Sequence, residues 1–231
     1  MTSPARWPHV LFDLDGTLVD TIALIVASYQ HAVRTVTGRQ PDEAEARAWI
    51  GRPLLPALLE VDPQRGAEMD AVYRTWNLAN SERLIRPYPG IDSLLGTLRE
   101  HGVSTGVATS KRRHSAELAL RLVGLDGRIE LLATMESTAV HKPDPRPLLY
   151  AVERLGAQPG ACAYVGDAVV DVQAARAAGM TSIAVAWGAA GRQTLELADP
   201  DHLVEDVSQL KALLLGKDLA APTSSVEPPG V

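Results

Sequence analysis

Two carboxylates near the start of the chain, Asp13 and Asp15, have the residue type and spacing for catalysis. They follow the apolar pair Val10-Leu11 and precede Gly16-Thr17. Residues two apart share one face of an extended strand, but Gly and Thr favour a turn, so the chain is predicted to leave the strand here. Paired carboxylates at a strand end suit a nucleophile, a proton donor and a metal ligand set close together. The plain alternative is a surface turn.

Three further polar clusters lie at the ends of predicted elements. One follows an apolar run over 103–108, one precedes a helical pattern, and one follows an apolar run over 161–165. They read Thr109-Ser110-Lys111, His141-Lys142-Pro143-Asp144-Pro145 and Gly166-Asp167-Ala168-Val169-Val170-Asp171. Open α/β sheets carry their chemistry at the carboxyl ends of strands. Independent surface turns would not be expected to supply acids, hydroxyls and a lysine in this arrangement, so the set favours one active site.

The elements that must position these clusters are of two kinds. Over 21–84 the apolar spacing predicts one helix after another with no strand signal, covering 20–37, 41–50, 53–60 and 63–83. The segment Arg86-Pro87-Tyr88-Pro89-Gly90 ends this pattern, because proline disfavours helix at the residue before it. After it, strands over 103–109, 129–134, 161–165 and 181–187 alternate with helices over 91–101, 112–123, 145–155 and 168–178. A last strand and helix are expected over 202–215.

Such alternation predicts an α/β fold with a doubly wound parallel sheet and right-handed crossovers. The helical stretch separates the first strand, over 7–13, from the others. We therefore expect an α/β core domain over 1–18 and 86–216 with a helical cap domain over 19–85 inserted in it. The two connections, near Val19-Asp20 and near 86–89, would act as the hinge. Residues 217–231 lack a periodic apolar face and are predicted to be a disordered tail.

Composition narrows the class of protein. A net charge of −6 argues against a nucleic-acid partner, which would normally meet a basic face. No run approaches about 18 apolar residues, so no membrane span is expected. Cys162 is the single cysteine, which excludes an intramolecular disulfide and fits a reducing compartment. We expect a cytoplasmic monomer or homodimer.

The order of the four motifs, from about Val10 to Leu215, is similar to that of the haloacid dehalogenase superfamily in its phosphatase branch. This resemblance implies a Rossmann-like core with an inserted helical cap, and a Mg²⁺-dependent phosphohydrolase acting on a small phosphorylated metabolite. Some segments look closest to pyrophosphatases of the PpaX kind and to phosphoglycolate phosphatases; they cover 73–77, 86–90, 141–145 and 186–188. The expected substrates are therefore 2-phosphoglycolate or inorganic pyrophosphate.

The resemblance also implies roles for individual residues. Asp13 matches the nucleophile that forms an aspartyl-phosphate, and Asp15 matches the general acid and base. Lys142 would neutralise the phosphoryl oxygens, and Thr109 would hydrogen-bond the transferring group. Phosphate contacts are further expected from Gly16, Thr17 and Ser110.

The implied metal ligands are oxygens, as Mg²⁺ prefers. They are the carboxylates of Asp13 and Asp167 and the backbone carbonyl of Asp15, whereas Asp171 would hold Lys142 or a metal-bound water. In the cap, the loop Gly51-Arg52-Pro53-Leu54 looks substrate-facing. There Arg52 could bind a second anionic group through a bidentate contact, or be a solvated surface arginine.

Two details bear on the choice of branch. The dehalogenases lack the second acid of the first motif. Because Asp15 supplies that acid here, we do not expect this chain to cleave carbon–halogen bonds. Ala168 stands where the family often has Ser, which removes one hydrogen bond near the site. Two other classes of function stay open: a phosphotransferase resembling β-phosphoglucomutase, and a non-catalytic binding module on the same fold.

Overall fold

A central sheet of six parallel strands organises this computed structural model, which describes residues 5–216. The strand order is β5-β4-β1-β6-β7-β8. In that order the strands are Glu130–Ala133, Ser104–Ala108, His9–Phe12, Cys162–Gly166, Thr181–Val185 and His202–Val204. Phe12, the last residue of β1, pairs with Val107 of β4 and with Val165 of β6. The carboxyl ends of these three neighbouring strands are therefore nearly level.

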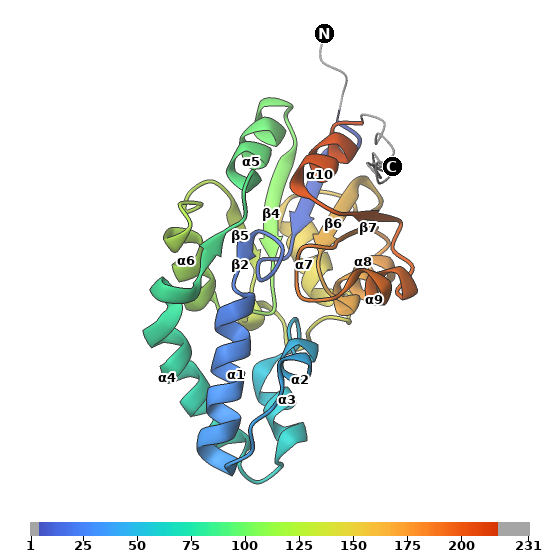
Figure 1. Cartoon of the computed structure of the whole chain (residues 1–231). Coiled ribbons are helices and arrows are strands. Elements are labelled where there is room, and N and C mark those ends of the chain that lie inside the picture. Colours follow the sequence, from blue (N-terminus) through green and yellow to red (C-terminus); the bar gives the residue numbers. More distant parts are fainter. Residues whose placement is uncertain (1–4, 217–231) are drawn as a thin grey trace, which may run out of the picture.

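Helices cover both faces of the sheet, because the strand residues alternate between two apolar layers. Val10 and Phe12 face the layer that holds α5 (Ile91–Glu100), α6 (Arg113–Leu122) and α10 (Val207–Leu214). Leu11, between them, faces α7 (Arg146–Arg154) and α8 (Val169–Ala177). The short helix α9 (Arg192–Leu197) buries Leu195 against β7 in a smaller cluster. The result is a three-layer α/β/α arrangement (Figure 1).

Four helices lie beyond one end of the sheet and have an apolar core of their own (Figure 1). They are α1 (Ile22–Thr37), α2 (Glu43–Ala48), α3 (Leu54–Val61) and α4 (Gly66–Leu84). The two chain connections to this helical part pair with each other, because β2 (Val19–Asp20) and β3 (Arg86–Pro87) form a two-stranded antiparallel sheet. The division into core and cap domains stays a proposal.

The predicted α/β class with a doubly wound parallel sheet is confirmed. Two features were not predicted: the helix α9, and the pairing of β2 with β3. The second predicted helix, over 41–50, is shorter in the structure, where it is limited to α2. This helix begins after Asp42, because the Asp42 carboxylate caps it by accepting a hydrogen bond from the Glu45 N–H at 2.7 Å. The predicted tail over 217–231 lies outside the described residues. None of the helices in the described range is both long enough and apolar enough to cross a bilayer.

Candidate active site

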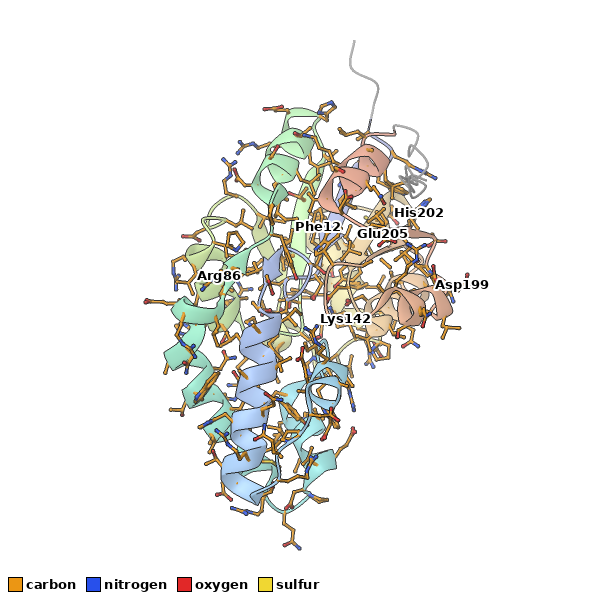
Figure 2. The ribbon with its side chains drawn as sticks, in the orientation of Figure 1. Phe12, Arg86, Lys142, Asp199, His202 and Glu205 are labelled. Atoms are coloured by element: carbon orange, nitrogen blue, oxygen red, sulfur yellow. The ribbon has the colours of Figure 1, made fainter. Side chains whose placement is uncertain are left out.

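The fold brings three predicted site residues to one edge of the sheet. Asp13 directly follows β1, Thr109 follows β4, and Asp167 follows β6. Parallel neighbouring strands end at the same edge of a sheet. All three side chains are buried, with Asp13 exposed by 3% and Asp167 by 1%. Figure 2 shows Lys142 at this edge, toward helices α1 to α4.

The ammonium group of Lys142 is the centre of the site. Its Nζ donates to Asp13 Oδ1 at 2.8 Å, to Asp171 Oδ1 at 2.6 Å and to Tyr164 Oη at 2.9 Å. An ammonium has three N–H groups, so all of them are used. Asp171 is fixed in turn, because its Oδ2 accepts a hydrogen bond from the backbone N–H of Ala168 at 3.0 Å.

The carboxylate of Asp167 is enclosed by backbone and by a hydroxyl. Thr17 Oγ1 donates to its Oδ1 at 3.2 Å, and the backbone N–H of Ala189 donates to its Oδ2 at 2.6 Å. Gly16 has a φ of +80°, and a Cβ built there would lie 2.1 Å from Asp167 Oδ2. The first motif therefore needs glycine both for its backbone conformation and for this close approach. Thr17, which was expected at the phosphate, donates its hydroxyl to Asp167 in this structure.

Buried negative charge dominates the electrostatics. The carboxylates of Asp13, Asp167 and Asp171 offer oxygens within 4.8 Å of one another. Burial raises the pKa of Asp13 to about 6; Lys142 opposes the rise, and Asp171 adds to it. Burial, followed by the charges of Asp171 and Asp13, holds the pKa of Asp167 well above its usual range. For Lys142, burial disfavours the charge, but Asp13 and Asp171 prevail and raise its pKa.

This donor set fits a divalent cation. Carboxylate oxygens are the ligands that Mg²⁺ prefers, and the cluster holds three carboxylates around a single ammonium group. A cation here would compensate the charge of Asp167, whose pKa is raised by burial and by the neighbouring Asp171 and Asp13. Asp171 joins this cluster by its side chain, whereas Asp15 could reach a cation only through its backbone carbonyl, because its carboxylate points elsewhere.

Asp15, two residues after Asp13, turns away from the buried cluster. Lys111 Nζ donates to Asp15 Oδ1 at 2.8 Å and to Oδ2 at 3.1 Å. Thr21 Oγ1 donates to the same Oδ1 at 2.6 Å. The side chains of this ion pair keep 12% and 14% exposure, so Asp15 is more accessible to solvent than Asp13, whose side chain is 5% exposed.

A cavity of about 420 Å³ lies over these residues. Asp13, Asp15, Thr109 and Ser110 form part of its wall. Other parts come from the segment 111–118, from Met135 and Glu136, and from the helical part, which includes Arg52. The guanidinium of Arg52 pairs with Glu60 and lies 4.6 Å from the centroid of the Trp49 ring. Arg52 thus borders the site, as the sequence predicts, but its charge is already engaged by Glu60.

Three residues of the site were missed in the sequence. Tyr164 was counted among the apolar residues of a strand, yet its hydroxyl contacts Lys142 and donates to the carbonyl of Ala108 at 2.8 Å. Lys111 was noted in its cluster without a role, and Thr21 was counted as the start of a helix. The sequence predicted a strand over 161–165, but no local signal in it revealed the partners of the Tyr164 hydroxyl.

Comparison with known proteins agrees with this geometry. A family model described as haloacid dehalogenase-like hydrolase matches residues 10–185. The pyrophosphatase PpaX of Bacillus velezensis is 34% identical over 205 residues, which cover 89% of this chain and 95% of that protein. A crystal structure described as a predicted phosphatase from Clostridium acetobutylicum is 26% identical, with a TM-score of 0.80 and coverage of 91% and 99% of the two chains. One described as a predicted phosphoglycolate phosphatase from Haemophilus somnus is 25% identical, with a TM-score of 0.76 and coverage of 88% and 96%.

Proposed function

We propose that this chain, which belongs to the haloacid dehalogenase-like hydrolase family, is a Mg²⁺-dependent phosphohydrolase that uses Asp13 as its nucleophile. The observation that carries the proposal is the placement of Asp13. Its carboxylate lies at the end of β1, against the ammonium of Lys142 at 2.8 Å, and it borders the cavity. A carboxylate so placed can attack phosphorus while a fixed positive charge compensates the charge that develops.

In the proposed reaction, Asp13 takes the phosphoryl group and forms an aspartyl-phosphate as the bond to the leaving oxygen breaks. Water then attacks this phosphorus, releases inorganic phosphate and restores the carboxylate. Lys142 and the hydroxyl of Thr109, with nearby backbone N–H groups, would stabilise charge on the phosphoryl oxygens. Splitting the hydrolysis into two displacements replaces one difficult step with two easier ones.

Asp15 would protonate the leaving oxygen in the first displacement and activate water in the second. It borders the same cavity as Asp13. In the present arrangement its carboxylate is held by Lys111 and Thr21. A rotation of this side chain away from both donors would therefore accompany proton transfer.

Asp13, Asp167 and the backbone carbonyl of Asp15 would hold Mg²⁺, with Asp171 fixing Lys142 beside them. When bound, the cation supplies positive charge that neutralises the buried carboxylates and the phosphoryl oxygens. Thr17 and the Ala189 N–H keep Asp167 oriented for that task. The paired strands β2 and β3 support the proposal that residues 19–85 act as a cap hinged at these two connections.

The test is release of inorganic phosphate by the purified full chain, with Mg²⁺ and with EDTA. The names of the relatives make inorganic pyrophosphate and 2-phosphoglycolate the first compounds to assay, with p-nitrophenyl phosphate and hexose phosphates beside them. Mg²⁺-dependent release that disappears in a folded Asp13→Asn variant supports the proposal. Exchange of phosphate between sugar positions without net release would instead support a phosphotransferase. Full activity of Asp13→Asn would contradict the proposed nucleophile.

A further inference from the structure

We infer that the leaving group of the natural substrate is an organic group with a large apolar part, rather than a second phosphate. The inference deepens the proposed function and rests on it, because it assigns an occupant to the cavity over Asp13. The cavity is large, its wall is mainly apolar away from Asp13, and most of its cationic side chains are already in ion pairs.

The cavity is large compared with pyrophosphate or 2-phosphoglycolate. The cavity of about 420 Å³ lies within the range of about 300–1,000 Å³ in which pockets hold drug-sized organic ligands. Pyrophosphate and 2-phosphoglycolate have few non-hydrogen atoms and would occupy a small part of it. The cavity extends from Asp13 at the sheet edge to residues of α1, α3 and α4, so one ligand can reach both ends.

The wall of the cavity is mainly apolar where it is remote from Asp13. It includes Ile25, Trp49, Leu54, Leu78 and Leu118. Leu78 on α4 is 56% exposed, so an apolar side chain is presented to the cavity without protein to cover it. The Trp49 ring stacks on Tyr29, with centroids 5.7 Å apart and planes at 18°. An apolar ligand group would remove these surfaces from water, which favours binding.

The charged groups of the wall argue against a second phosphate. Arg52 pairs with Glu60, and Arg74 pairs with both oxygens of Asp70 at 2.6 and 2.7 Å. Lys111 is likewise engaged by Asp15. A phosphate would have to displace one of these carboxylates or lie beside it, and an anion gains most from donors whose charge is not already compensated. Within residues 5–216, the cationic wall residue without an ion pair is Arg112, which is exposed to solvent.

A series of primary alkyl phosphates tests the inference. Ethyl, butyl, hexyl and 2-phenylethyl phosphate have leaving alcohols of similar basicity, so differences in kcat/KM report binding of the alkyl part. We expect kcat/KM to rise at least about tenfold from ethyl to hexyl or phenylethyl phosphate, and to exceed the values for pyrophosphate and 2-phosphoglycolate. Leu78→Gln should flatten this rise several-fold. Leu197→Gln is the matched control, because Leu197 is 88% exposed on α9 and does not line the cavity.

The outcomes separate the inference from the proposed function. A series that does not rise with alkyl length, or a higher kcat/KM for pyrophosphate or 2-phosphoglycolate than for every alkyl ester, would overturn the inference and leave the phosphohydrolase intact. Failure of the folded, Mg²⁺-supplied protein to release phosphate from any compound would overturn the proposed function itself. An equal loss of preference in Leu78→Gln and Leu197→Gln would also count against the cavity as the binding site.

Discussion

Lys142 and Tyr164 are joined by a hydrogen bond of 2.9 Å between Nζ and Oη, inside the sheet edge that carries the candidate active site. Tyr164 Oη in turn donates a hydrogen bond to the carbonyl of Ala108 at 2.8 Å. Ala108 directly precedes Thr109, so the phenol links the lysine to the strand end that presents the threonine. Tyr164 therefore positions two groups of the site without bordering the cavity itself.

Replacing Tyr164 with Phe should weaken both folding and catalysis. The change leaves one N–H of Lys142 and the carbonyl of Ala108 without a partner, at a cost of about 1–3 kcal/mol. We expect kcat to fall on the order of tenfold, which corresponds to about 1.4 kcal/mol of transition-state stabilisation. Phosphate-release kinetics and urea unfolding measure the two effects. Tyr150→Phe, on the partly exposed α7 position, is the control; equal kcat values for both variants would exclude the positioning role.

Replacing Lys142 with Met should destabilise the protein strongly near neutral pH. The side chains of Lys142 and Asp13 are exposed by 2% and 5%, so removing the ammonium leaves buried carboxylates uncompensated, at about 3–5 kcal/mol. The loss should be smaller near pH 5, because the pKa of Asp13, already about 6, rises further and the carboxyl takes up a proton.

Lys111→Met is the matched control for that experiment. Lys111 and Asp15 also form an ion pair, but with 12% and 14% exposure they remain in contact with water. We expect a loss of about 1 kcal/mol or less from this change. Urea unfolding at both pH values measures the difference between the two variants. A loss in Lys142→Met that equals the control, or does not depend on pH, would show that the buried carboxylates have another source of compensation.

Much of the fold and of the site could be predicted because the signals are local. Apolar runs followed directly by polar clusters located the ends of β1, β4 and β6, and with them Asp13, Thr109 and Asp167. The first helix ends at Thr37, as predicted; Gly38 follows it with a φ of +77°, and the Gly38 N–H donates to the Arg34 carbonyl at 2.9 Å. Each of these features depends on residues within one turn of helix or one strand.

What could not be predicted depends on partners distant in the chain. Tyr164 and Lys142 are 22 positions apart, and the sequence near either residue does not predict their contact. The pairing of β2 with β3 joins Val19 to Pro87 across the whole helical segment. The helix α9 has six residues with one buried apolar side chain, which is too short for a periodic pattern.

The stabilising effect of Mg²⁺ should increase with pH. Asp13 has a pKa of about 6 in the folded chain against an ordinary value of 3.8, so between these values the folded state binds more protons than the unfolded state. The metal-free protein therefore loses stability as pH rises through this window. Binding of Mg²⁺ requires the deprotonated carboxylates and relieves their repulsion. We expect a clearly larger rise in Tm on adding Mg²⁺ at about pH 8 than at about pH 5.

Calorimetry with Mg²⁺ and with EDTA at the two pH values checks this expectation. Asp167→Asn should remove most of the Mg²⁺ effect, since it takes one carboxylate from the cluster. A rise in Tm that is the same at both pH values, or that persists in Asp167→Asn, would place the metal elsewhere.

Gly51, in the helical part, packs against the fourth motif, and its replacement by Ala should impair closure over the site. A Cβ at Gly51 would lie 3.2 Å from Cβ of Ala168 and 3.3 Å from Cγ2 of Val170. The same contact explains why a small residue suits position 168. We expect KM to rise several-fold, because the added methyl group pushes the loop away from the motif that carries Asp167.

The Gly38→Ala variant measures the cost of backbone strain alone, without a new contact of the methyl group. Gly51 and Gly38 have φ values of +86° and +77°, so alanine is strained at both, by about 1 kcal/mol. Nothing lies within 4 Å of a Cβ at Gly38, whereas the Cβ at Gly51 meets the core. The free energy of unfolding should therefore fall by a similar amount in the two variants, and Gly51→Ala alone should change KM. A KM shift in both variants would trace the effect to strain in the helical part rather than to the contact with Ala168.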